Sequence, residues 1–154
     1  RSFHVTGVQT CALPILRNGL NRNLRALETI IPFGMTPSKW ASQAELLLRD
    51  RREWLRLEWR DTRLGLVAAA NSPSRSPLLA PWGPDHMMAE INLACTQAKR
   101  WSNATYSPST FFAAHNNVGV EVVQMCLPWS MDGELSGYLI ASYSLADTLT
   151  SLVS

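Results

Sequence analysis

Lysine is scarce in this chain, and long apolar runs are missing. Lys39 and Lys99 are its two lysines, and the formal net charge is +2 over 154 residues. This balance lacks the basic excess of a nucleic-acid-binding protein, so we expect no nucleic-acid partner. No run of about eighteen apolar residues occurs, so the sequence itself predicts no membrane span. A hydrophobic content of 46% suffices for one globular domain with a core.

Motifs of catalysis and metal binding are also missing. The sequence contains no CxxC, HxH, HExxH, GxSxG, GxGxxG or GK[ST] pattern, which argues against zinc ribbons, metallohydrolases, serine hydrolases and phosphate-binding loops. We therefore predict no catalytic residue, no metal and no cofactor. The acidic residues lie singly beside arginines, as in Asp50/Arg51 and Glu58/Arg60. That arrangement is typical of a solvated charged surface.

The first fifteen residues need separate treatment. Val5 to Ile15 reads VTGVQTCALPI, which resembles the translation of a common sequencing-library adapter. We therefore interpret residues 1–15 as a read artefact outside the fold. A signal peptide is the alternative, but it needs a longer apolar core than CALPIL. An adapter junction requires Leu16 to be encoded by TTA or TTG.

The clearest pattern is a long hairpin from Val118 to Leu145. Valines alternate with other residues in its first half, as in a half-buried strand. Asp132-Gly133 is a turn signal, because glycine adopts a positive φ without steric cost. The second half, Tyr138 to Tyr143, contains no charge, which predicts a central strand.

The preceding segments predict two helices and a shorter hairpin. A leucine-rich stripe from Leu16 to Ile31 has the spacing of an amphipathic helix. Thr36 followed by Pro37 predicts the start of a second helix that ends near Asp50. Period-two alternation predicts a strand at Leu55–Trp59 and a returning strand at Leu64–Ala70.

The middle of the chain predicts a loop and a third helix. Asn71–Pro84 is rich in serine and proline, which is typical of a binding segment or lid when a loop is this long. We expect Asp85 to cap a helix that continues to Trp101. Ala104–Ser107 and Phe111–Ala114 are weaker strand candidates. Ser144 and Asp147 have the spacing of a capping box for a terminal helix, Leu145–Val153.

Together these elements predict an α+β domain. Two strands, a helical crossover and about three more strands form a PAS-like five-stranded antiparallel sheet, with the N-terminal helices and the crossover helix on one face. We divide the chain into the artefact (1–15), the N-terminal helices (16–53) and the PAS-like domain (54–154).

A ligand pocket, if one forms, should lie between the sheet and the segment that covers it. Trp82 is an aromatic residue on the long loop, where it could wall a pocket. Each candidate also has a structural interpretation, such as a core aromatic with a satisfied hydroxyl. The ligand-binding candidates are Trp82, His86, Arg100, Tyr106, Ser107, Gln124 and Tyr143.

Four segments carry a family resemblance: EWRDTRLGLVAAA, ATYSPS, VEVVQMCLPW and GELSGYLIASYSLADTLTSLV. With the order of elements, they resemble the extracytoplasmic PAS-like sensor region of bacterial membrane-bound sensor histidine kinases, over about Leu16 to Ser154. The resemblance implies a non-catalytic, periplasmic sensory domain of an inner-membrane, ATP-dependent histidine kinase in a two-component system. In such a compartment Cys95 and Cys126 could pair, or they could stay buried as small apolar residues.

The resemblance also implies how a signal would pass. Leu16–Ile31 is similar to a helix that follows a first membrane span, and Leu145–Ser154 to the lead into a second. A small-molecule ligand would shift the two terminal helices relative to each other, and the first helix could pair in a homodimer. The alternatives are a cytoplasmic PAS- or GAF-like interaction module without a ligand, and a small enzyme. Apolar spans of about twenty residues on both sides would favour the sensor.

Overall fold

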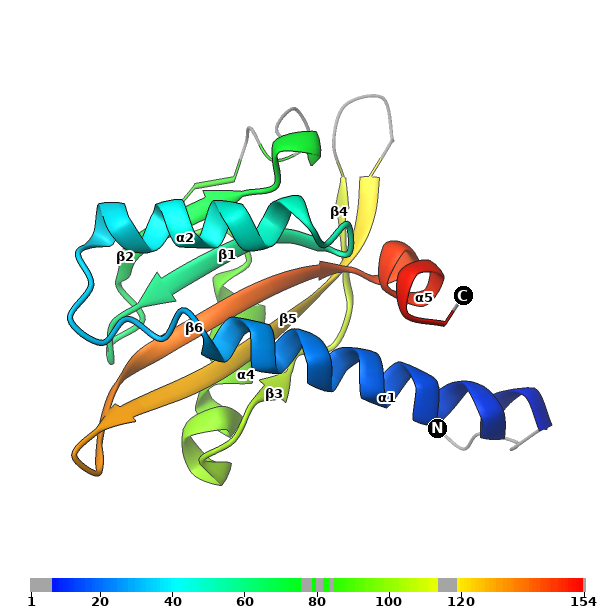
Figure 1. Ribbon diagram of the computed structural model, residues 1–154, viewed down its shortest axis with the longest axis horizontal. Helices are drawn as coiled ribbons and strands as arrows, with labels where there is room; N and C mark the ends of the chain where they lie inside the picture. The colour runs from blue at the N-terminus through cyan, green and yellow to red at the C-terminus, as the bar shows by residue number, and fades with distance from the viewer. Residues whose placement is uncertain (1–6, 76–78, 80–81, 84, 114–118, 154) are drawn as a thin grey trace.

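The computed structural model describes residues 7–75, 79, 82–83, 85–113 and 119–153, with side chains described from Asn18 to Thr150 (Figure 1). The elements along the chain are α1 (Gly7–Glu28), α2 (Pro37–Arg49), β1 (Trp54–Arg60), β2 (Leu66–Asn71), the 3-10 helix η1 (Pro73–Arg75), α4 (Met88–Trp101), β3 (Thr105–Tyr106), β4 (Thr110–Ala113), β5 (Gly119–Met131), β6 (Glu134–Ser144) and α5 (Leu145–Val153).

The strands form one antiparallel sheet in the order β2-β1-β6-β5-β3, with β4 also paired to β5. The predicted α+β, PAS-like class is confirmed, and β6 is central as its lack of charge predicted. The sheet has six strands rather than the five expected. The 13-residue β5 is long enough for two short partners, with β3 opposite Met125 and β4 opposite Val122. Pro108 lies between those partners and has no N–H to continue a ladder.

The helices cover both faces of the sheet rather than one. Figure 1 shows α1 and α2 on the near side and α4 behind. Leu27 and Trp40 pack with Met125 and Leu139 in the largest core cluster. Helix α4 packs through Ile91, Cys95 and their neighbours onto Cys126 and Ile140. Because successive strand residues point to opposite faces, the apolar β5–β6 hairpin requires a cover on each side. We name these the α1/α2 face and the α4 face.

The helix boundaries follow local signals in part. Helix α1 includes residues 7–15, which we had set aside, and ends at Glu28 rather than Ile31. Thr36 caps α2 as predicted, accepting a hydrogen bond from the Lys39 backbone N–H at 3.2 Å. The Asp132-Gly133 turn has φ values of 52° and 81°. Both lie in the left-handed region that a two-residue hairpin turn needs.

The start of α4 differs from the prediction. Asp85 lies in a turn before the helix, and the residue in the N-cap position is Met87, which has a φ of 57° and provides no side-chain cap. The predicted cap at Asp85 is therefore wrong. Ser144, by contrast, accepts a hydrogen bond from the Asp147 N–H at 3.3 Å, as one half of a capping box does.

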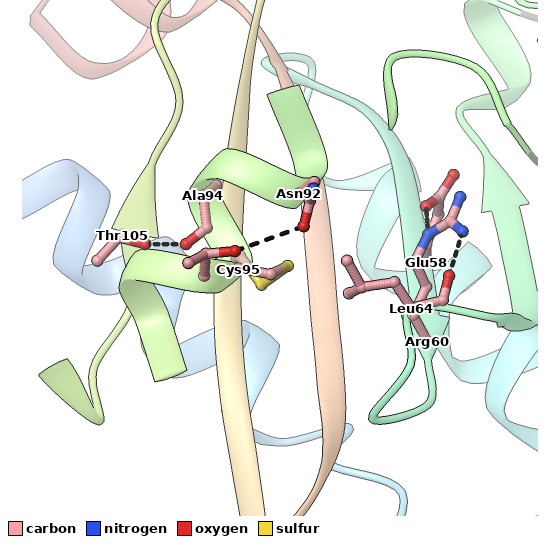
Figure 2. Close-up of a disulfide and its surroundings, with 9 residues drawn as sticks. Glu58, Arg60, Leu64, Asn92, Ala94, Cys95 and Thr105 are labelled. Atoms are coloured by element: carbon pink, nitrogen blue, oxygen red, sulfur yellow. Dashed lines mark hydrogen bonds and ion pairs between the residues drawn. A yellow bond between two sulfur atoms is a disulfide. The ribbon is translucent and has the colours of Figure 1, made fainter. Parts of the chain in front are cut away.

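A disulfide joins α4 to β5. Cys95 and Cys126 are bonded with their Cα atoms 5.2 Å apart, and both are almost fully buried. Figure 2 shows this bond beneath α4, with Thr105 donating a hydrogen bond to the Ala94 carbonyl beside it. Of the two possibilities for these cysteines, the structure shows the pair.

Candidate functional site

A row of polar side chains crosses the α4 face of the sheet. Gln124 on β5 lies opposite Ser142 on β6, which lies opposite Arg56 on β1, which lies opposite Asn71 on β2. Register therefore places the four on one line and one face. We name them the polar row. It separates two apolar clusters of this face: one contains Ile140, and the other lies at the opposite end of the same face.

Hydrogen bonds connect neighbours within the polar row. The Ser142 hydroxyl donates to Gln124 Oε1 at 2.7 Å, and Arg56 Nη1 donates to Asn71 Oδ1 at 2.8 Å. Gln124 is fully buried and Ser142 is 1% exposed. Buried polar groups are stable only when they are hydrogen-bonded, so the row is a built feature of the fold.

Arg56 also belongs to a buried charged triad. Glu58 accepts from Arg56 Nε at 2.6 Å and from Arg60 Nε at 2.7 Å, and all three side chains are more than nine-tenths buried. Arg60 Nη1 additionally donates to the Leu64 carbonyl at 2.8 Å, as Figure 2 shows. Two guanidinium groups around one carboxylate leave an excess of one positive charge on this face.

An aromatic group lies beside the Gln124 end of the polar row, where Met87, the neighbour of His86, accepts a hydrogen bond from Gln124. The Trp82 ring stacks on His86 at 5.0 Å between centroids, and Phe112 meets both edge-on at 5.3 and 4.8 Å. Burial, reinforced by the positive charge of Arg56, lowers the pKa of His86 below its ordinary value of 6.5, while Glu90 and Glu58 oppose the shift. His86 therefore stays neutral at neutral pH, and it lies close enough to Arg56 to feel its charge.

The seven predicted ligand-binding residues are divided by the sheet. Trp82, His86, Ser107 and Gln124 lie together on the α4 side, where the Gln124 N–H donates to Ser107 Oγ at 3.0 Å. Tyr143 packs in the core of the opposite face. Tyr106 lies beside it, with 6.3 Å between ring centroids. Arg100 is exposed near the C-terminal end of α4.

Tyr143 belongs to a polar corner of the α1/α2 face. Asn23 donates to Glu53 at 2.7 Å and accepts from Arg51 at 3.0 Å, and Arg51 lies over the Trp54 ring. The Tyr143 hydroxyl has no partner in hydrogen-bonding geometry among the described residues, although Trp54 and Asn23 lie near enough to oppose the rise in its pKa. Burial raises its pKa well above the ordinary range, with a further contribution from Tyr106. This hydroxyl is therefore protonated at any physiological pH.

Sequence reasoning missed most of the polar row. Glu58 lies beside Arg60 in the sequence, and this arrangement of an acid next to an arginine predicts a solvated charged surface. That expectation is wrong, because α4 and the segment before it cover this face. Period-two alternation identifies which residues share a face. Whether that face is exposed to solvent depends on the layer that packs over it.

A separate open cavity lies beside the disulfide. It has a volume of about 340 Å³ and is lined by Arg63, Leu64, Asn92, Lys99, Tyr138 and neighbouring residues of α4 and the β1–β2 turn. In the part of the chain that the structure describes, no group of three or more His, Cys, Asp or Glu side chains could hold a metal ion. Among the described helices, none is long and apolar enough to cross a membrane.

Three solved structures have a similar fold. The ligand-binding domain of the Pseudomonas aeruginosa PAO1 amino acid chemoreceptor PctB, in complex with L-Gln, matches with a TM-score of 0.62 and 15% identity, over 94% of this chain and 55% of that one. The corresponding domain of PctC, in complex with GABA, gives 0.56 and 14%, over 94% and 62%. A domain of a putative sensory box/GGDEF family protein from Vibrio parahaemolyticus gives 0.55 and 11%, over 90% and 59%.

These similarities establish the fold, and the chain spans a little over half the length of each matched structure. No protein-family model matches the sequence. No curated protein matches it either.

Proposed function

We propose that this chain is the sensory domain of a bacterial membrane-bound signalling protein, with a sensor histidine kinase as its parent. The observation that carries the proposal is the polar row beside the Trp82–His86–Phe112 group. Ligand sites combine an aromatic wall with a few placed polar groups, and this face has both. The shared fold with domains that bind L-Gln and GABA supports it.

The proposed domain senses and does not react. The phosphoacceptor histidine and the ATP site would belong to other parts of the parent. A ligand can shift the parent between two states only through a difference in its affinity for them. The polar row must therefore be connected to a segment that moves.

A short route connects the polar row to the terminal helix α5. Asn71 is followed by the buried Ser72, whose hydroxyl lies 3.1 Å from that of Ser74 in η1. Arg75, the last residue of η1, forms an ion pair with Asp147 on α5. Helix α5 is in contact with α1, and Figure 1 shows the start of α1 and the helix α5 on the same side of the molecule. In this proposal a ligand on the row changes the position of α5 against α1.

We further propose a periplasmic location, with the parent anchored in the inner membrane. The disulfide supports an oxidising compartment, because such bonds are rare in the cytosol. Apolar spans of about twenty residues in the full-length gene, before Leu16 and after Ser154, would support the anchoring. Their absence on both sides would favour a cytoplasmic module instead.

A homodimer through α1 remains part of the proposal for the full-length protein. The predicted leucine stripe is mostly used within the chain, because Leu27 is buried in the core and Leu20 and Leu24 pack against it. Arg22 and Arg25 point outward. A dimer contact through the described part of α1 would therefore use this outward side rather than the leucine stripe. Analytical ultracentrifugation of the full-length protein in detergent would test it.

Thermal shift of this chain against a broad panel tests ligand binding. The panel contains amino acids, small carboxylates, amines, sugars and nucleosides at millimolar concentration. A binder present at a hundred times its Kd should stabilise the fold by about 2.7 kcal/mol. A flat response across the panel would contradict the sensory proposal.

The coupling route is tested separately in the full-length protein. Arg75→Ala and Asp147→Ala should leave ligand affinity nearly unchanged and weaken the ligand's effect on autophosphorylation. Both partners are about a quarter exposed, so each change should cost less than about 1 kcal/mol of stability. Restored signalling in the charge-swapped pair, Arg75→Asp with Asp147→Arg, would identify the ion pair itself as the connection. Unchanged signalling in all three variants would exclude this route.

A further inference from the structure

The α4 face has more hydrogen-bond donors than acceptors around the polar row. Both oxygens of Glu58 are used by Arg56 and Arg60, and Asn71 Oδ1 is used by Arg56. Gln124 Oε1 is used by Ser142. Each of these acceptor oxygens therefore already has a donor. Three donors nearby lack a strong acceptor.

Arg56 supplies the first available donor. Its Nε binds Glu58 and its Nη1 binds Asn71, while its Nη2 has no partner among the described residues. The side chain is 8% exposed. A guanidinium presents a fixed planar set of donors and stays charged at any pH. An incoming acceptor that meets Nη2 would also meet a positive charge that Glu58 only partly balances.

Gln124 supplies a second donor that is poorly used. Its Nε2 donates to the Met87 sulfur at 3.4 Å, and a thioether is a weak acceptor. A ligand oxygen that replaced this sulfur as the acceptor would form a stronger hydrogen bond with Gln124 Nε2. The amide is held in this orientation because its Oε1 accepts from the Ser142 hydroxyl.

Trp82 supplies a third donor. Its indole Nε1 is buried and has no hydrogen-bond partner among the described residues. The ring stacks on His86, which is neutral at neutral pH because burial and Arg56 lower its pKa. A buried indole N–H usually finds a partner, so this one also lacks an acceptor.

We propose that the polar row recognises the carboxylate of a small ligand, with Arg56 as its anchor and Gln124 and Trp82 as further donors. This inference rests on the proposed sensory function and assigns the ligand class. A carboxylate is acceptor-only, planar and negative, which matches a site with surplus donors and one excess positive charge. Glu90 and Glu58 are the acids whose charges reach His86, and Glu58 is already paired with Arg56 and Arg60, so the anionic end of the ligand lies on the Arg56 side, away from Glu90.

Isothermal titration calorimetry on this chain with matched acids and amides tests the assignment. The probes are propionate, succinate and benzoate, each compared with its primary amide. An acid should bind at least about tenfold more tightly than its amide, because the amide is neutral and has an NH2 donor in place of one acceptor oxygen. Arg56→Lys keeps the charge and removes the guanidinium, and should weaken acid binding about tenfold or more.

Two further variants keep the test independent of one substitution. Gln124→Glu is nearly isosteric and places a negative charge beside the carboxylate, so it should abolish acid binding. Trp82→Phe keeps an aromatic ring, removes the indole N–H and should weaken acid binding several-fold. Arg63→Lys, in the exposed β1–β2 turn, is the control and should bind as the original chain does. Circular dichroism and melting temperature report whether each variant is folded.

Each outcome decides between the two proposals. Acid-selective binding that Arg56→Lys and Gln124→Glu both weaken supports the carboxylate assignment. Equal binding of acid and amide, or unchanged acid binding in the folded variants, overturns it and leaves the sensory function in place. The carboxylate assignment is overturned in the same way if none of the acids binds but another compound of the broad panel does. If no compound binds, the result counts against both proposals.

Discussion

The two faces of this sheet are built differently, although they share the same strands. On the α1/α2 face, the main cluster of buried side chains is apolar or aromatic, and polar groups collect at one corner around Asn23 and Glu53. On the α4 face, two apolar clusters are separated by the polar row and the Arg56–Glu58–Arg60 triad. One face contributes mainly to stability. The other contains polar groups that the hydrophobic core does not require.

The contrast is sharpest at consecutive residues of β6. Ser142 is hydrogen-bonded within the polar row, whereas Tyr143 packs edge-on against Trp54 in the aromatic core. Both are almost completely buried. Burial therefore does not distinguish a site residue from a core residue here, and hydrogen-bond partners do. The predictions below test this difference between the faces.

Glu58→Gln should have the largest effect. It removes the carboxylate that lies between two buried guanidinium groups, and breaking a buried ion pair in this way costs about 3–5 kcal/mol. The free energy of unfolding from urea titration is the measurement. Glu134→Gln, on the exposed hairpin turn, is the control and should change it by no more than about 0.5 kcal/mol. A small effect of Glu58→Gln would mean that the α4 face is wetter than the structure indicates.

Removing the disulfide should affect the α4 face more than the other. Cys95 and Cys126 are separated by 31 residues, and closing such a loop is worth about 3.5 kcal/mol on the chain-entropy description. The double variant Cys95→Ala/Cys126→Ala should lose stability of that order. Hydrogen exchange should show α4 amides losing more protection than α2 amides. Equal loss in both helices would mean that the faces unfold as one unit.

The two faces can be compared by removing one hydroxyl oxygen from each, with Ser142→Ala on the α4 face and Tyr143→Phe on the α1/α2 face. Ser142→Ala leaves the buried Gln124 Oε1 without its donor and should cost about 1–3 kcal/mol. Tyr143→Phe removes a hydroxyl that has no hydrogen bond with the described residues, so stability should change by no more than about 0.5 kcal/mol or rise slightly. Thermal unfolding of both variants under one condition is the measurement. The reverse order of costs would contradict the assignment of roles to the faces.

His86 should give the smallest effect, visible only as a pH dependence. Its folded-state pKa lies below the ordinary 6.5 because of burial and then Arg56, against opposing contributions from Glu90 and Glu58. The folded protein therefore binds the proton less readily than the unfolded chain. Stability should be unaffected above pH 6.5 and should fall as the pH drops through that value towards the folded-state pKa. His86→Phe should remove this part of the decline, and an identical pH profile for both proteins would contradict the shift.

The local patterns predicted most of the architecture. Alternation and the Asp132-Gly133 turn defined the β5–β6 hairpin, and Thr36 marked the start of α2. These signals act between neighbours in the chain, so they can be read from the sequence. The start of α4 was predicted less well, because the left-handed Met87 in the cap position has no local signal.

Four of the seven candidate ligand-binding residues lie together: Trp82, His86, Ser107 and Gln124 are on the α4 side, but Tyr143 is on the other face and Arg100 is exposed. Their role in ligand binding stays a prediction. Arg56 was missed because an arginine in an alternating strand has the same pattern whether the face is wet or covered. Alternation assigns it to a face and gives no information on the second layer.

By itself, the amino-acid sequence determined the order of helices and strands, the central position of β6 and the α+β class, because periodicity and turn chemistry depend on neighbours in the chain. The tertiary structure alone decided that helices cover both faces, that Cys95 meets Cys126, and that four strands place Gln124, Ser142, Arg56 and Asn71 on one line. Strand register is set by pairing between distant segments, such as Arg56 with Ser142, which are 86 residues apart, and no local pattern contains that information.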